Sequence, residues 1–213
     1  MAGFFSPDSK LYQAMSRLTD IVKLNLLWLL FSLPVVTVGI STIAAYTVTL
    51  KMSEEREGRI AHDFVRAFKE NWKQGIVMSF ISIISVWAIY LDFQLADAVE
   101  ENGFIFLIVG IITAYILIFS LAYAYPLLAR YENTIILTLK NSFQIGMKYF
   151  VRTIVMLLIV AIELAVIFWN ETSLFIGAIV GPAFIMFTVS VFAMKIFREL
   201  EKVPGAVTGG QDK

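Results

Sequence analysis

Residues 25–50 of the chain, NLLWLLFSLPVVTVGISTIAAYTVTL, contain no charged side chain, although a proline and a glycine interrupt the run. A helix that crosses the hydrocarbon core of a bilayer needs about 20 mainly apolar residues. With Leu24 included, the run has 27 residues, which make about 40 Å of helix at about 1.5 Å per residue. This length is enough for one tilted crossing and too short for two, so the sequence predicts a membrane-spanning segment over residues 24–50.

The composition of the whole chain supports a membrane location. Hydrophobic residues make up 59% of the 213 residues, charged residues make up 16%, and the mean hydropathy is +0.78. These values lie outside the usual range of soluble domains and indicate an integral membrane protein whose main partner is the lipid bilayer. The formal net charge is zero and no basic domain is present, so no nucleic-acid partner is expected. The absence of cysteine excludes disulfides, thiolate metal sites and a cysteine nucleophile.

Four further apolar runs are long enough to cross a bilayer, and none shows the alternation of a strand. The predicted fold class is therefore an all-α, polytopic membrane helical bundle with about five transmembrane helices and additional cytoplasmic amphipathic helices. We expect a single membrane-embedded domain over residues 1–202 and a disordered C-terminal tail over 203–213. The predicted spans are residues 24–50, 75–91, 103–129, 153–169 and 173–194.

Basic residues are distributed unevenly among the segments that connect the spans. Residues 51–74, 130–152 and 195–213 hold 14 of the 17 Lys and Arg residues, whereas residues 92–102 and 170–172 hold none. The positive-inside rule places the first three segments, and with them the C-terminus, in the cytoplasm.

Three basic segments have the apolar periodicity of amphipathic helices, and each of them precedes a span. Their apolar stripes are Leu11, Met15, Leu18 and Val22; Ile60, Phe64, Phe68 and Trp72; and Ile136, Leu139, Phe143, Met147 and Phe150. Such helices can lie in the membrane interface with their apolar faces in the acyl chains, or they can pack against the ends of neighbouring spans. The sequence leaves both alternatives open.

The first amphipathic segment makes the sidedness of the first span a question. A single crossing puts the N-terminus outside, opposite the two similar helices, whereas a re-entrant segment puts all three on one side. Pro34 removes a backbone hydrogen bond, Thr37 follows it, and Gly39 allows a bend, so this is the expected hinge. We expect one kinked crossing with an external N-terminus, because broken backbone within a membrane is tolerated only inside protein or beside a cavity.

Glu163 is the ionisable residue that lies well inside a predicted span. A charged carboxylate at that depth costs about 3 kcal/mol, so it usually faces the interior of the bundle and often marks an ion or substrate path. The alternative is a carboxyl group that only joins two helices by a hydrogen bond. The sequence does not separate these roles.

Small residues and prolines mark sites of helix packing and bending. Gly177 and Gly181 lie on one helix face and predict close approach of another helix, within the chain or in a homo-oligomer. Pro126 and Pro182, like Pro34, are expected to kink or end their helices.

Signatures of enzymes are nearly absent. His62 is the one histidine in the chain, and neither a phosphate-binding loop nor a dinucleotide-binding fingerprint occurs. We therefore predict no catalytic residue, no metal site and no cofactor.

The region from the first span to the second amphipathic helix resembles the YesL-like family of small bacterial membrane proteins, a domain of unknown function. The residues that carry this resemblance are Asn25, Leu33, Pro34, Thr37, Val38, Gly39, Phe64, Phe68, Lys69, Asn71 and Trp72. One departure is Ile40, where many relatives have proline or a small residue. The resemblance implies a bacterial plasma membrane location and an accessory or regulatory role in carbohydrate uptake, with a sugar permease or a sensor kinase as partner. The alternative function is a small oligomeric transporter or channel with Glu163 near the path.

Overall fold

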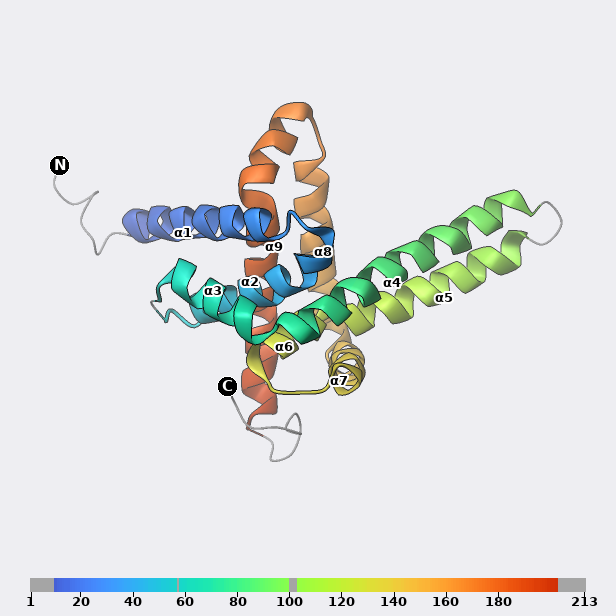
Figure 1. The fold of residues 1–213 in the computed structure, drawn as a ribbon. Helices are drawn as coiled ribbons and strands as arrows, with labels where there is room; N and C mark the ends of the chain where they lie inside the picture. Colours follow the sequence, from blue (N-terminus) through green and yellow to red (C-terminus); the bar gives the residue numbers. More distant parts are fainter. Residues whose placement is uncertain (1–9, 57, 100–102, 203–213) are drawn as a thin grey trace.

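The computed structural model describes residues 10–56, 58–99 and 103–202, and these residues form an all-helical structure (Figure 1). The helices are α1 (Lys10–Phe31), the 3-10 helix η1 (Val35–Thr37), α2 (Val38–Ser53), α3 (Ile60–Glu70), α4 (Trp72–Ala98), α5 (Gly103–Ala122), α6 (Ala124–Arg130), α7 (Ile135–Lys148), α8 (Phe150–Ile167) and α9 (Glu171–Leu200).

Five helical stretches are long and apolar enough to cross a membrane, so the predicted all-α, multi-span fold is confirmed. They are Val35–Ser53, Trp72–Ala98, Gly103–Arg130, Phe150–Ile167 and Glu171–Leu200. The third stretch consists of α5 and α6, which are separated at Tyr123, three residues before Pro126.

Two helical hairpins extend from a common centre (Figure 1). One hairpin is α4 and α5, and the other is α8 and α9, where the side chain of Asn170 accepts a hydrogen bond from the Ser173 backbone N–H and caps the start of α9. Between them lies α2, which packs against α3, α4, α6 and α9. The main contacts of α5 are with α4 and α7, so the two hairpins are held together through the central helices and through α7.

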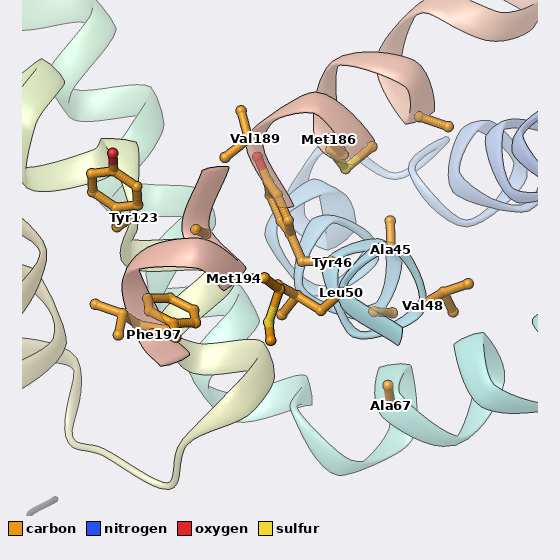
Figure 2. Close-up of a cluster of buried hydrophobic side chains, with 14 of the residues drawn as sticks. Ala45, Tyr46, Val48, Leu50, Ala67, Tyr123, Met186, Val189, Met194 and Phe197 are labelled. Atoms are coloured by element: carbon orange, nitrogen blue, oxygen red, sulfur yellow. The ribbon is translucent and has the colours of Figure 1, made fainter. Parts of the chain in front are cut away.

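The core lies where α2 meets α9. Figure 2 shows Tyr46 and Leu50 of α2 beside Val189 and Met194 of α9 in a cluster of buried side chains. Small residues on α2, among them Ala44 and Ala45, are fully buried and allow this approach. A hydrogen bond of 2.7 Å joins the buried hydroxyl groups of Thr49 and Ser190 across the same interface. Apolar packing and one satisfied polar pair therefore fix α2 against α9.

The structure corrects the prediction that residues 24–50 form one kinked crossing. Helix α1 ends at Phe31, and α2 begins after a short 3-10 helix. The Trp28 indole N–H donates to the Thr42 hydroxyl over 3.1 Å, and Arg17 pairs with Glu55 over 2.9 Å. Since residues early in α1 contact the end of α2, and residues late in α1 contact its beginning, the two helices run antiparallel. The predicted span is thus divided between two helices that double back.

Ion pairs bring the three predicted cytoplasmic segments to one end of the molecule. Glu54, at the end of α2, lies 3.3 Å from Arg56, 3.5 Å from Arg130 and 3.7 Å from Arg198. The pair between Arg17 and Glu55 adds the first half of α1 to this end.

Helix α1 begins beside the basic segments and not opposite them, and the side of the membrane on which its first half lies stays a prediction. The N-terminus itself and the predicted disordered tail, residues 203–213, lie outside the described residues. Which end of the molecule faces the cytoplasm stays a prediction from the positive-inside rule.

Candidate functional site

Local hydrogen bonds stabilise the turn between α1 and α2. Pro34 is extended, with φ of −74° and ψ of 117°, and precedes the 3-10 helix. The Thr37 hydroxyl lies 2.6 Å from the carbonyl oxygen of Phe31 and 2.7 Å from that of Pro34. Thr37 thereby gives a donor to the carbonyl of Phe31, the last residue of α1, where a helix leaves its carbonyl groups without helical partners. Pro34 and Thr37, which are three residues apart, thus lie in a tight reversal of the chain.

Gly39 is needed for a close helix crossing and not for a bend, since it lies inside α2 and is buried. A Cβ atom there would collide with the carbonyl oxygen of Gly75 on α4, and one on Gly75 would come within 2.5 Å of the Ile40 Cα atom. The Gly39 N–H donates to the Ser79 hydroxyl over 2.7 Å, and that hydroxyl lies 2.9 Å from the Val36 carbonyl oxygen. Ser79 thus satisfies backbone groups at the start of α2.

Asn25 and Pro182 form a single structural unit between α1 and α9. Pro182 lacks an N–H, which leaves the carbonyl of Ala178 without its helical donor. The Asn25 side chain, which is fully buried, donates to that carbonyl over 2.8 Å and accepts from the Ala183 N–H over 3.0 Å. The side-chain amide of Asn25 on α1 therefore supplies hydrogen-bond partners to the backbone of α9 beside its proline.

Gly177 and Gly181 both pack on the same residue of the neighbouring helix. A Cβ atom on Gly177 would lie 2.6 Å from the Cγ2 atom of Ile167, and one on Gly181 would lie 2.7 Å from its Cδ1 atom. These glycines therefore serve the packing of α9 on α8 within one chain. Pro126 is buried in the first turn of α6, beside the break at Tyr123.

Glu163 lies four residues before the end of α8 and faces the middle of α9. The Thr188 hydroxyl donates to its Oε1 atom over 2.6 Å. Its Oε2 atom is buried and has no hydrogen-bond partner among the described residues. The carboxyl group is thus held on one side and has a free acceptor on the other. This arrangement suits either a helix-joining hydrogen bond or a cation-binding position.

The predicted amphipathic helix around Phe64 turns its apolar face into the protein. Phe64 is fully buried, and its ring and that of Phe68 lie 5.4 Å and 5.0 Å from the ring of Phe31. Asn71 is buried and its side chain donates to the Ala67 carbonyl at the end of α3. Lys69 and Trp72 are exposed, the latter at the start of the α4 span. Of the two alternatives for this helix, packing on protein is the one observed.

An ionic cluster joins the ends of α2, α6 and α9. Arg130 lies 2.9 Å from Glu201, and the Tyr131 hydroxyl donates to the same carboxylate over 2.6 Å. Partial burial opposes ionisation of Glu201, but the hydrogen bonds from Tyr131 and Arg130 outweigh it and hold its pKa below the usual value. Burial, together with the Glu201 carboxylate, raises the pKa of Tyr131. The cluster therefore favours the ionised carboxylate.

Sequence reasoning missed this cluster and the role of Ser79. The charged members come from segments far apart in the chain, and no local spacing connects them. Ser79 gives a weak signal, because a hydroxyl group in an apolar span usually bonds to its own helix.

The chemistry available to these sites is limited. Within residues 10–56, 58–99 and 103–202, no group of three or more His, Asp or Glu side chains could hold a metal ion. His62 is exposed and lies 3.6 Å from Asp63. Partial burial of Asp63 is outweighed by hydrogen bonds from Lys51 and His62, which lower its pKa, so this cluster is one of paired charges.

Comparison with known proteins adds one result. Residues 21–93, which extend from the second half of α1 into α4, match a family described as "Protein of unknown function, DUF624". The comparisons found no match among curated proteins and none among solved structures. The matched region contains the chain reversal, α2 and α3, and Asn25, Gly39 and Ser79 within it supply the contacts described above. The chain is thus a multi-span membrane protein, and its residues 21–93 are similar to this family of unknown function.

Proposed function

We propose that this protein is a non-enzymatic accessory or regulatory component of carbohydrate uptake in a bacterial plasma membrane. It binds a sugar permease or a sensor kinase at the predicted cytoplasmic end and does not itself carry out a reaction. The link to carbohydrate uptake rests on the resemblance of residues 24–75 to the YesL-like family.

The observation that supports the binding role is the orientation of α3, which has one face packed on protein and the other face exposed. Phe64 and Phe68 fix one face of the helix against Phe31, as described above. The opposite face presents exposed basic side chains, including Arg66 and Lys69, to the surroundings. Partners that approach this end meet the exposed Lys69 and the ion pair that Arg66 forms with Glu70 over 3.0 Å, and such charged groups suit recognition by charge complementarity.

The experiment is co-purification from cells that express the protein with a tagged sugar permease or a tagged sensor kinase. Reversal of charge in R66E/K69E is expected to abolish co-purification and to lower uptake of labelled sugar by the cells. The control K140E/K148E reverses two charges on α7 and is expected to preserve the complex. The proposal fails if neither partner co-purifies with the unchanged protein.

A second candidate function is a small oligomeric transporter or channel, which the geometry of Glu163 favours. Its carboxyl group lies inside the helical region, accepts one hydrogen bond from Thr188 and has a buried oxygen without a partner among the described residues. Such a carboxyl group can bind a cation or a proton.

Purified protein in liposomes separates the two candidates. Transport of a labelled sugar or of protons that is lost in E163Q and kept in T188V would establish the transporter. The accessory role predicts no transport above that of empty liposomes for the unchanged protein and for both variants.

A further inference from the structure

Helix α7 has an apolar stripe that is exposed in the structure. Ile136 is 82% exposed, Met147 is 45% exposed and Phe150, which follows the helix, is 46% exposed. Leu139 and Phe143 continue the same stripe and are half-buried. For a helix at the end of a membrane protein, such a surface needs a partner that removes it from water.

The opposite face of α7 fixes this orientation. Ser142 is buried, accepts a hydrogen bond from the Tyr123 backbone N–H over 3.0 Å and donates to the Phe119 carbonyl over 3.2 Å. A Cβ atom on Gly146 would lie 2.8 Å from the Phe119 ring, so the helix lies close to α5. The apolar stripe cannot turn inward without breaking these contacts.

The charges on α7 indicate the chemistry of the partner. Lys140 and Lys148 are exposed, and residues 135–148 contain no acidic side chain. The next helix, α8, begins at Phe150, and its length and composition suit a membrane span. The stripe therefore lies where a span meets its surface, and lysines beside it can reach anionic headgroups while their stems cover apolar surface.

The geometry points to α7 as an in-plane interfacial helix that binds anionic phospholipid. Its apolar stripe lies in the acyl chains, and Lys140 and Lys148 bind the headgroup phosphates. Helix α3 has the same pattern in sequence, but its aromatic residues are already covered by Phe31. This inference does not depend on the proposed function.

Fluorescence quenching by brominated lipid tests the position of the stripe, because the chain has no cysteine of its own. A bimane label is attached to I136C on the stripe or to Q144C, which is exposed on the side of Lys148. In vesicles of phosphatidylcholine with brominated acyl chains, we expect severalfold stronger quenching at residue 136 than at residue 144. Equal, weak quenching at both positions would overturn the inference, since the stripe would then face water or another protein surface.

The preference for anionic lipid is tested in mixed vesicles of phosphatidylcholine and phosphatidylglycerol, in which one lipid or the other is brominated. Each lysine near the surface favours anionic lipid about fivefold. Quenching at residue 136 should therefore be stronger with brominated phosphatidylglycerol, and K140Q/K148Q should remove the difference. The control K69Q/K73Q removes two charges elsewhere and should retain it. Equal quenching by the two lipids in the unchanged protein would refute the binding of anionic lipid.

Discussion

Helix α2 and helix α5 are both apolar, but protein encloses the first and leaves most of the second exposed. Over an apolar segment of 18 residues in the stretch that contains α2, 56% of the residues are buried, against 11% over such a segment in the stretch that contains α5. Glycine, alanine and hydroxyl residues let α2 approach α4 and α9 closely, whereas α5 is dominated by large aliphatic residues that suit contact with lipid. Residue size and hydroxyl groups, more than apolarity, therefore decide whether these membrane helices pack on protein.

The short apolar end of α1 explains how this helix is placed beside α2. The apolar end of α1, Leu24–Phe31, is about 12 Å long at about 1.5 Å per residue, less than half of a hydrocarbon core of about 30 Å. Asp20 and Lys23 precede it and lie 3.6 Å apart at the surface. We therefore expect α1 and α2 to enter the membrane together as a hairpin, with the exposed Leu33 and Val35 near its deepest point.

The largest effect is expected from a methyl group at the crossing of α2 and α4. Gly39→Ala should lower the free energy of unfolding in detergent by about 3 kcal/mol or more, because the added Cβ atom meets backbone atoms of α4. The same change in α5, Gly110→Ala, places its Cβ atom 3.1 Å from the Asp92 Cβ atom and should change stability by less than about 1 kcal/mol. Similar losses in the two variants would remove the distinction between the helices.

A smaller loss is expected when the unit of Asn25 and Pro182 is broken. Asn25→Ala leaves the Ala178 carbonyl and the buried Ala183 N–H without their side-chain partner and should cost about 2 kcal/mol of unfolding free energy. Pro182→Ala supplies a helical donor to the Ala178 carbonyl, so the cost of Asn25→Ala should be smaller in that background. Strict additivity in the double-mutant cycle would show that the two residues are not coupled.

The smallest effect concerns the ionic cluster at the ends of α2, α6 and α9. The pKa of Glu201 is lower in the folded protein than its ordinary value of 4.5. Its contribution to stability is therefore complete above pH 4.5 and is lost as the pH falls through the lowered folded pKa. The loss of thermal stability on acidification below pH 4.5 should be smaller in Glu201→Gln than in the unchanged protein, and identical losses would argue against the cluster.

The sequence predicts the membrane class and the four later spans, because long apolar runs leave the backbone no alternative to helices in lipid. It also groups the basic segments correctly at one end of the molecule. It does not predict the reversal after Phe31, since the apolar run continues without a charged residue and its length suits one crossing. The reversal depends on the hydroxyl of Thr37 and on packing against Ser79, forty residues further along the chain.

The two basic amphipathic helices α3 and α7 show the same limit of prediction from the sequence. The periodicity of Phe64 and Phe68 in α3 is matched by that of Ile136 and Phe143 in α7, yet the rings of the first pair lie against Phe31 of α1, whereas Ile136 is exposed. Periodicity identifies an apolar face but not its partner. The contact of Asn25 with the backbone around Pro182 is likewise invisible in sequence, because it joins positions more than 150 residues apart.

Helices α1 and α2 double back, so the first half of α1 should lie on the same side of the membrane as the end of α2. This arrangement can be tested by reacting S16C, R59C and D97C with a membrane-impermeant thiol reagent in intact and in permeabilised cells. We expect S16C and R59C to react only after permeabilisation, whereas D97C, at the far end of α4, should react in intact cells. Labelling of S16C in intact cells together with D97C, while R59C stays protected, would show that α1 and the end of α2 lie on opposite sides of the membrane.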